Sequence, residues 1–321
     1  MTPTSKTLLA LSFSALAASA CGGDIGDSIM PDAGMAEVEP DASPPPAIEC
    51  EQPPPQLMIV LDRSGSFARR PDGSFAPNTD AGKQETRWHI MIEAIRGVTT
   101  TLQEEVQFGL TLFPYDPDGN NGNDCSNLDT WLTEYLPPET TDLSCQPGEV
   151  KVSPNMMNGP AMQSALDRDN TGLCSTTPIG SGLAAAHADL SAITTPEFQQ
   201  AAVLITDGAD NCDGRDGYNT NSLEEADAMA AAGIRVFVLG FSGSGEDFEP
   251  THLNNLACAG GTAPNFAANC ELVGAGYRAV DTTGQTRLYY LADEVASLTQ
   301  ALQEIAEDAC NEPETDLRQI D

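Results

Sequence analysis

The residues best suited to chemistry in this sequence are two acids and three hydroxyl side chains at the ends of apolar segments. Asp62, Ser64 and Ser66 alternate along a D-R-S-G-S stretch directly after an apolar run. Asp207 follows a second apolar run, and Thr177 stands just ahead of a helical pattern. All five side chains offer oxygen atoms, which are the ligands that Mg²⁺, Ca²⁺ and Mn²⁺ prefer. The sequence therefore predicts a divalent-metal site at these five residues.

Each of these signals also has a simpler interpretation. Asp and Ser side chains hydrogen-bond to their own backbone in turns, so the stretch from Asp62 is also typical of a turn without a ligand. Thr177 suits a helix N-cap with Pro178 at the first helical position, and Asp207-Gly208 suits a plain turn. Three such signals gathered at one place in the fold favour a metal site over three unrelated turns.

Four apolar runs predict buried strands, and periodic segments between them predict helices. We expect strands at 56–61, 106–113, 201–206 and 234–240, and helices at 88–102, 179–193, 222–232 and 291–305. This alternation predicts an α/β fold of three layers, a doubly wound, mostly parallel sheet with helices on both faces. Ligands of such sheets bind beyond the carboxyl ends of the strands, where Asp62 and Asp207 stand. The five oxygen-bearing residues are therefore expected to meet at one rim.

Other segments lack apolar periodicity. Residues 67–84 indicate a long polar loop, and 114–174 indicate an irregular elaboration rather than a second domain. A further loop is expected to carry Cys258 and Cys270.

Two acidic clusters are weaker candidates for cation binding. They consist of Asp116, Asp118, Asn120 and Asp124, and of Asp210, Asp213 and Asp216. The first has Asn121 where a calcium loop normally has glycine, so a polar loop is favoured. The second is expected to be a solvated loop after Asp207.

Three motifs, in this order, resemble the von Willebrand factor A (VWA) domain and its metal-ion-dependent adhesion site. They are M-I-V-L-D-R-S-G-S (58–66), T-T-P-I-G-S-G-L (176–183) and A-V-L-I-T-D-G (202–208), and residues 289–306 resemble the final strand-to-helix passage of that domain. The resemblance covers roughly 55–310 and is interrupted by 114–174. It is specific because each motif falls at the expected boundary of a strand or helix.

The resemblance implies a role for each residue of the predicted metal site. Ser64 and Ser66 would bind the ion directly, Thr177 in some states, and Asp62 and Asp207 directly or through water. Ligands of the family often supply a Glu or Asp to complete the metal shell. The implied partner is a protein or surface ligand that offers a carboxylate, and the implied ion is Mg²⁺, with Ca²⁺ and Mn²⁺ as alternatives.

The amino-terminal residues indicate export. Residues 1–20 resemble a signal peptide, and the small residues directly before Cys21 resemble the bacterial lipobox, so we expect lipidation of Cys21. Secretion without a lipid anchor is the alternative. Gly22 stands where an aspartate signals inner-membrane retention in some bacteria, so the outer membrane or cell surface is favoured, with the periplasm as an alternative. Residues 21–54 are expected to be an acidic, proline-containing linker, and 311–321 a polar tail.

The cysteines also fit an exported chain. Of nine cysteines, lipidation of Cys21 leaves eight, an even number that predicts disulfides. Neighbouring chain ends in the expected fold suggest a clamp between Cys50 and Cys310. Four other cysteines are expected to close local loops, as Cys125–Cys145 and Cys258–Cys270. Cys174 and Cys212 are expected together near the metal rim, because they flank Thr177 and Asp207.

The charge and the missing motifs exclude several functions. A net charge of −34 argues against nucleic acid and against binding an anionic membrane by electrostatics, so any membrane contact would be through the lipid anchor. The sequence has no G-x-S-x-G or phosphate-loop motif and no C-x-x-C zinc spacing. We therefore expect a binding protein rather than an enzyme. A metal-stabilised scaffold is the alternative, and a metal-dependent hydrolase a remote one.

Overall fold

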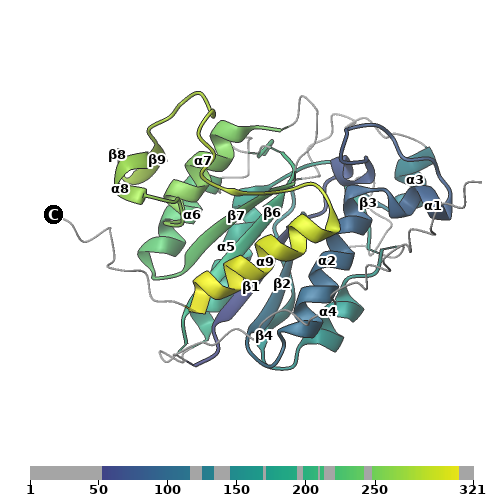
Figure 1. The fold of residues 1–321 in the computed structure, drawn as a ribbon, viewed down its shortest axis with the longest axis horizontal. Coiled ribbons are helices and arrows are strands. Elements are labelled where there is room, and N and C mark those ends of the chain that lie inside the picture. Colours follow the sequence, from purple (N-terminus) through teal and green to yellow (C-terminus); the bar gives the residue numbers. More distant parts are fainter. Residues whose placement is uncertain are drawn as a thin grey trace, which may run out of the picture. The chain divides into compact units, whose positions relative to one another are not determined.

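The apolar runs of the sequence form the centre of a six-stranded sheet in the computed structural model (Figure 1). The strands are β1 (Gln56–Asp62), β2 (Gln107–Phe113), β4 (Glu149–Asn155), β6 (Gln200–Thr206), β7 (Arg235–Phe241) and β10 (Tyr290–Ala292), in the order β10-β7-β6-β1-β2-β4. The structure describes residues 53–115, 125–133, 145–168, 171–193, 198–208, 210–212, 221–241 and 248–310.

Five of the six strands are parallel. β1 pairs in parallel with β2 and β6, β7 does so with β6 and β10, and β4 runs antiparallel to β2 at the edge. The register places Leu61 opposite Ile205, so β1 and β6 end at the same edge of the sheet. Asp62 and Asp207 therefore leave the sheet side by side.

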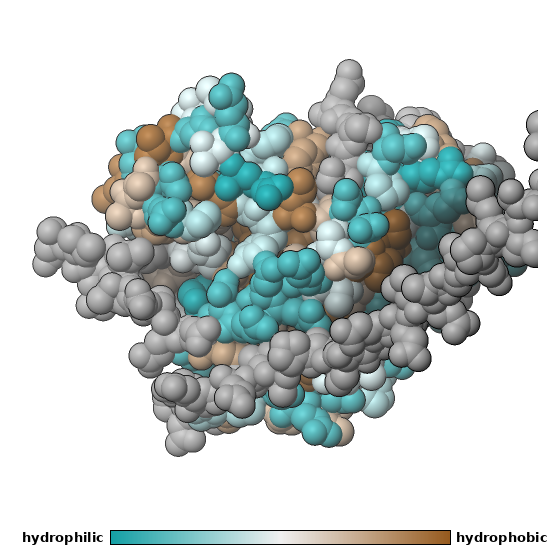
Figure 2. All heavy atoms as spheres, in the orientation of Figure 1, coloured by the Kyte–Doolittle hydropathy of each residue, from teal (hydrophilic) through white to brown (hydrophobic). Residues whose placement is uncertain are grey.

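Helices cover both faces of the sheet (Figure 1). One face carries α2 (Arg87–Thr101), α4 (Gly159–Ala165) and α9 (Val295–Cys310), and the other carries α5 (Ile179–Ala192), α6 (Ser222–Ala231) and α7 (Pro250–Ala259). Hydrophilic side chains gather along the outside of α9, whose inner residues are buried (Figure 2). The predicted three-layer α/β fold is confirmed.

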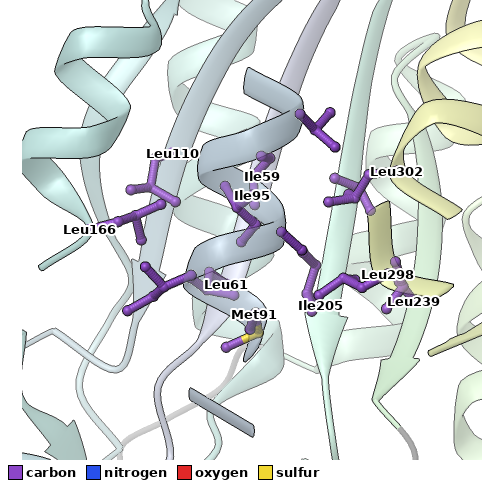
Figure 3. Packing of buried hydrophobic residues seen from close by; sticks show 14 of the residues in the cluster. Ile59, Leu61, Met91, Ile95, Leu110, Leu166, Ile205, Leu239, Leu298 and Leu302 are labelled. Atoms are coloured by element: carbon purple, nitrogen blue, oxygen red, sulfur yellow. The ribbon is translucent and has the colours of Figure 1, made fainter. Parts of the chain in front are cut away.

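The continuous apolar runs are explained by this double covering. Leu57, Ile59 and Leu61 of β1 pack in the core beneath α2 and α9, whereas Met58 and Val60 pack in the core beneath α5, α6 and α7. Figure 3 shows Ile59 and Leu61 against side chains of α2 and α9. Each fully buried side chain of this size contributes about 1.5–3 kcal/mol, so both faces of the strand stabilise the sheet.

The region 114–174 is an elaboration that bears disulfides, as expected, but its described parts are more regular than the sequence indicates. It contains β3 (Cys125–Ser126), α3 (Leu128–Thr133), β5 (Leu173–Cys174), β4 and α4, and β3 pairs with β5 in a separate small sheet. Strand β4 has no continuous apolar run because it is an edge strand whose side chains are mostly half-buried or exposed.

Two other expectations are corrected. The expected 67–84 loop contains the short helix α1 (Asp80–Gln84). The 3-10 helix η1 (Gly65–Ala68) begins before this loop and extends into its first residues. The expected loop after β7 contains α7, α8 (Phe266–Asn269), β8 (Cys270–Val273) and β9 (Gly276–Ala279), with Cys258 inside α7.

The closing helix begins later than predicted and continues to Cys310. Leu291 lies on β10, and α9 begins at Val295, because a spacing of four residues across the strand end mimics a helical period. The strand-to-helix passage implied by the family resemblance is therefore the correct description of this segment. Within the described residues, the helices are all too short or too polar to cross a membrane.

Candidate metal site

Four of the five predicted metal ligands meet in one hydrogen-bonded group at the carboxyl ends of β1 and β6. The hydroxyls of Ser64 and Ser66 lie 2.8 Å apart, and Ser66 Oγ donates to Asp207 Oδ1 at 2.7 Å. Asp62 accepts from the Ser64 backbone N–H at Oδ1 and from Thr206 Oγ1 at Oδ2, both at 2.7 Å. The sheet thus gathers two carboxylates and two hydroxyls from segments 141 residues apart.

The turn that carries the serines is held against the 114–174 region. A Cβ atom at Gly65 would lie only 2.1 Å from the Trp131 ring, so no side chain fits at this position. Trp131 is 4% exposed and donates from Nε1 to the Leu173 carbonyl at 2.8 Å. The glycine of D-x-S-G-S therefore allows α3 to lie directly on the turn between Ser64 and Ser66.

The two acids of the site are buried. Asp62 is fully buried and Asp207 is 2% exposed. Burial and, next, the negative charge of Asp207 raise the pKa of Asp62 from 3.8 to about 8, although the hydrogen bonds from Thr206 and Ser64 lower it. Two buried carboxylates that repel each other are a favourable place for a cation.

An arginine that the sequence reasoning missed pairs with this site. Arg87 is the first residue of α2, is 4% exposed, and places Nη1 2.5 Å from Asp207 Oδ2. Its Nε donates to the Arg70 carbonyl at 3.1 Å, and its backbone N–H donates to the Arg69 carbonyl at 2.8 Å. One sequence signal existed: a cation in the first turn of a helix opposes the helix dipole, which suggests a nearby anion.

Thr177, the fifth predicted ligand, joins the rim through its backbone. Its N–H donates to Asn211 Oδ1 at 2.9 Å, and its carbonyl accepts from the Asn211 N–H at 3.3 Å. The expected N-cap is shifted, because Pro178 is the N-cap of α5 and Asp210 Oδ2 accepts from the Gly180 N–H at 3.0 Å. The segment after Asp207 therefore caps α5 in place of the Thr177 hydroxyl.

The acidic clusters are only partly covered by the structure. Asp210, expected in a solvated loop, is instead half-buried against α5. The remaining members lie outside the described residues: Asp116, Asp118, Asn120, Asn121, Asp124, Asp213 and Asp216.

Disulfides brace the segments that carry the site. The structure joins Cys125 to Cys174 and Cys145 to Cys212, so the expected Cys125–Cys145 bond and the grouping of Cys174 with Cys212 are wrong. The reason is the pairing of β3 with β5, which sets Cys125 directly opposite Cys174. The Cys125–Cys174 bond closes the 114–174 region on itself, and the Cys145–Cys212 bond links that region to the segment after Asp207.

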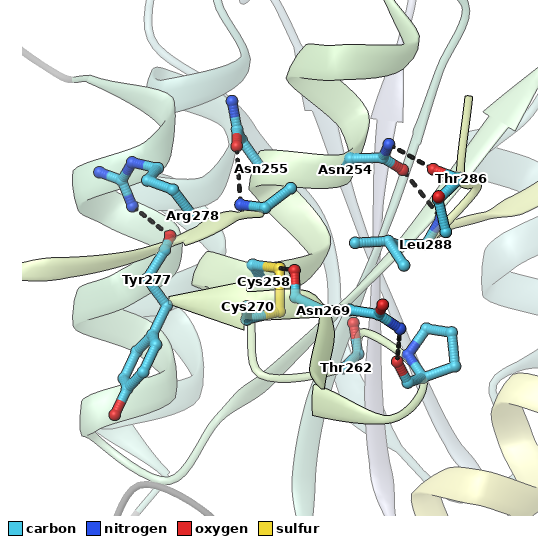
Figure 4. The surroundings of a disulfide bond; sticks show 12 residues. Asn254, Asn255, Cys258, Thr262, Asn269, Cys270, Tyr277, Arg278, Thr286 and Leu288 are labelled. Carbon is cyan, nitrogen blue, oxygen red and sulfur yellow. Dashed lines mark hydrogen bonds between the residues drawn. A yellow bond between two sulfur atoms is a disulfide. The ribbon is translucent and has the colours of Figure 1, made fainter. Parts of the chain in front are cut away.

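The other two expected bonds have different outcomes. The Cys258–Cys270 bond is confirmed and joins α7 to β8 (Figure 4). Cys310 is disulfide-bonded, and its expected partner Cys50 lies outside the described residues.

Each rim disulfide is anchored close to a segment of the site. The Cys174 N–H donates to the Arg63 carbonyl at 2.8 Å, and Ser64 forms a parallel bridge with Cys174. Cys212 lies in the segment that follows Asp207 and braces Thr177. The Asp207 segment is therefore covalently tied to the 114–174 region, and the Ser64 turn is held to it by backbone hydrogen bonding.

The donor set suits a small hard cation. Neighbouring oxygens of the site lie 2.7 and 2.8 Å apart, close to the octahedron edge of about 2.8–3.0 Å that follows from Mg²⁺–oxygen bonds of about 2.0–2.1 Å. In the described part of the chain, no three His, Cys, Asp or Glu side chains gather as a metal cluster, so this set depends on its hydroxyls. The oxygens favour Mg²⁺, Mn²⁺ or Ca²⁺ over softer metals.

Part of the chain matches a model of a known protein family. The family model described as "von Willebrand factor type A domain" matches residues 149–272, which include Thr177 and Asp207. This part of the chain is similar to a VWA domain. The strands in and around it belong to the mostly parallel, VWA-like sheet described above. No curated protein matches the sequence.

Several solved structures are similar to this chain at low identity. Proximal thread matrix protein 1 from the mussel byssus, with a zinc-occupied MIDAS motif, is 15% identical, with a TM-score of 0.45 over 82% of this chain and 49% of that one. The pilus adhesin SpaC of Lactobacillus rhamnosus GG is 16% identical, with a TM-score of 0.48 over 82% and 31%. The PilB minor pilin of Streptococcus sanguinis is 14% identical, with a TM-score of 0.48 over 81% and 62%. This chain spans about half the length of the mussel protein.

Proposed function

We propose that this chain is an exported binding protein that uses a divalent ion at its VWA-like rim to recognise a carboxylate on a protein or surface ligand. The observation that carries the proposal is the group of Asp62, Ser64, Ser66 and Asp207, two buried acids and two hydroxyls joined by hydrogen bonds of 2.7–2.8 Å. Hard cations prefer this kind of donor set.

Each residue has a role that follows from its contacts. Ser64, Ser66 and Asp207 would hold the ion, with Asp62 and Thr177 reaching it directly or through water. A bound ion supplies an electrophilic position for an anionic oxygen of the ligand. Thr206 and the Ser64 N–H hold the Asp62 carboxylate in a fixed orientation.

The proposal includes export and anchoring through a lipid on Cys21. The lipobox-like sequence before Cys21 and the acidic, proline-containing linker that follows support this location. Disulfides at the rim support it too, because such bonds persist in oxidising compartments. The proposed destination is the outer membrane or cell surface, and mass spectrometry of the amino-terminal peptide from the membrane fraction tests for the lipid.

Metal binding is tested by titrating Mn²⁺ or Mg²⁺ into the chelator-treated protein in a calorimeter. Asp62→Asn keeps the size of the side chain and is expected to weaken binding at least about tenfold, because it removes one charge from the donor set. Asp72→Asn is the matched control, because Asp72 is an exposed acid nearby whose side chain accepts from Ser74. Equal affinity in all three proteins would refute the metal site.

Ligand recognition is tested by cross-linking the protein to intact cells in Mg²⁺ or in EDTA. The expected cross-link forms with wild type and the Asp72→Asn control in Mg²⁺, and is lost in EDTA and with Asp62→Asn. A cross-link that survives both losses would overturn metal-dependent recognition.

A metal-stabilised scaffold is the second candidate. It is favoured by the burial of Asp62 and Asp207 at the ends of two central strands, where an ion would stabilise the sheet itself. A chelator that lowers the melting temperature while no cross-linked partner forms would select this function over ligand recognition.

A further inference from the structure

Asp207 is shared between the predicted metal ligands and a buried cation. One carboxylate oxygen, Oδ1, accepts from the Ser66 hydroxyl at 2.7 Å, while the other, Oδ2, lies 2.5 Å from Arg87 Nη1. Side-chain exposure is 5% for Arg87 and 1% for Asp207, so water does little to screen this pair.

Arg87 is fixed where it is. Its backbone N–H and its Nε both donate to carbonyls of the neighbouring segment, those of Arg69 and Arg70. The next residue, Trp88, is fully buried in the core under α2. The guanidinium is therefore built into the structure beside Asp207 and is not a flexible surface charge.

Other arginines close in sequence are engaged elsewhere. Arg70 pairs with Glu85, whose carboxylate lies 2.5 Å away, and Arg63 donates from Nε to the Pro114 carbonyl at 2.6 Å. Lys83 pairs with Asp129 at 2.7 Å. Arg87, by contrast, forms an ion pair with a carboxylate of the site.

We infer that Arg87 sets the charge of the metal site so that a metal-loaded rim requires one anionic ligand. This inference rests on the proposed function. Asp62 and Asp207 alone would neutralise a divalent ion, which would leave little attraction for a carboxylate. With Arg87 included, the loaded site carries one net positive charge, and a single ligand carboxylate restores neutrality. In a buried site this difference is large, because Coulomb energies rise as the effective dielectric falls.

The inference makes opposite predictions for the metal and for the ligand. Removing the arginine charge leaves Asp207 a full anion, so the ion itself should bind more tightly. The same change should weaken binding of a carboxylate to the loaded site, because the net positive charge is gone. A purely structural role for Arg87 predicts that both affinities fall together.

The test uses the full chain, Mn²⁺ as the metal and acetate as the carboxylate probe. Free Mn²⁺ is measured by electron paramagnetic resonance with and without acetate, for wild type, Arg87→Gln, Arg87→Lys and the control Arg70→Gln. We expect Arg87→Gln to bind Mn²⁺ on the order of tenfold more tightly without acetate and to lose the gain in affinity that acetate gives wild type. Arg87→Lys and Arg70→Gln should retain that gain.

The outcomes separate the inference from the function on which it rests. Wild type that binds no Mn²⁺ refutes the proposed function. Wild type that binds Mn²⁺ while Arg87→Gln binds it equally or more weakly overturns the inference alone. If Arg87→Gln does not fold even with Mn²⁺, the lysine variant decides: a retained acetate gain supports charge setting, and a lost gain overturns it.

Discussion

The contact between Gly65 and Trp131 gives the sharpest test of how the 114–174 region supports the rim. In Gly65→Ala, the new methyl group would lie 2.1, 2.3 and 2.7 Å from three atoms of the Trp131 ring. The ring cannot move away without losing the 2.8 Å hydrogen bond from Nε1 to the Leu173 carbonyl. Overpacking costs about 1–3 kcal/mol and a lost hydrogen bond about 0.5–1.5 kcal/mol, so the free energy of unfolding should fall by about 2–4 kcal/mol.

The assay is urea denaturation in EDTA, followed by Mn²⁺ titration of the folded variant. Gly97→Ala is the matched control, because a methyl group at Gly97 meets nothing within 4 Å in the middle of α2 and should stabilise the protein by about 1 kcal/mol. Mn²⁺ affinity should fall in Gly65→Ala and be unchanged in Gly97→Ala. Trp131→Leu should remove most of the penalty when combined with Gly65→Ala. A variant as stable as wild type, or no rescue by Trp131→Leu, would refute the packing argument.

Three further predictions follow from buried groups and from a disulfide. In EDTA, Asp62 holds its proton in the folded state up to a pKa of about 8 but loses it near 3.8 when unfolded, so the free energy of unfolding should fall as the pH rises between these values. Denaturation curves at several pH values measure this slope, and Asp62→Asn should flatten it. Replacing Cys145 and Cys212 by serine should lower the free energy of unfolding by about 4 kcal/mol, because the unfolded chain regains the conformational entropy of a loop of 67 residues. The same change should weaken Mn²⁺ binding. If calorimetry finds the unfolding free energy and the Mn²⁺ affinity unchanged, the bracing role is contradicted. Asn254→Ala should lower the free energy of unfolding by about 2–4 kcal/mol in a denaturation assay, because the buried Asn254 side chain donates to the Thr286 carbonyl and accepts from the Leu288 N–H (Figure 4). A decrease below about 1 kcal/mol would contradict this role.

The centre of the fold is predictable because burial on two faces leaves a clear signal. Strands β1 and β6 are covered by helices on both sides, so each appears as an unbroken apolar run. Strand β4 lies at an edge, and its side chains are mostly half-buried or exposed, so its sequence carries no such run. Helix α7 and the β8–β9 hairpin were missed because they lie in a segment whose turns and cysteines resemble a loop.

Some residues of the candidate site are also predictable from the sequence, and others are not. Asp62, Ser64, Ser66 and Asp207 are predictable because each stands at the carboxyl end of an apolar strand, and parallel strands bring those ends together. Arg87 is not predictable in this way, because its position depends on how the segment before α2 places the start of that helix beside Asp207. Disulfide connectivity also depends on the path of the chain, and among the described bonds the one within a local segment, Cys258–Cys270, matches the prediction.

The two rim disulfides also bear on when the site is assembled. Cys174 belongs to the short strand that bridges to Ser64, and Cys212 lies beyond Asp207, so each rim disulfide has one sulfur close to a segment that carries oxygens of the site. Thiols stay reduced in the cytosol and pair after export. In an exported chain, oxidation would therefore complete the bracing of the rim only after the protein leaves the compartment where it is made. The oxidation state of four cysteines would then decide where in the cell a metal ion first meets a rigid site.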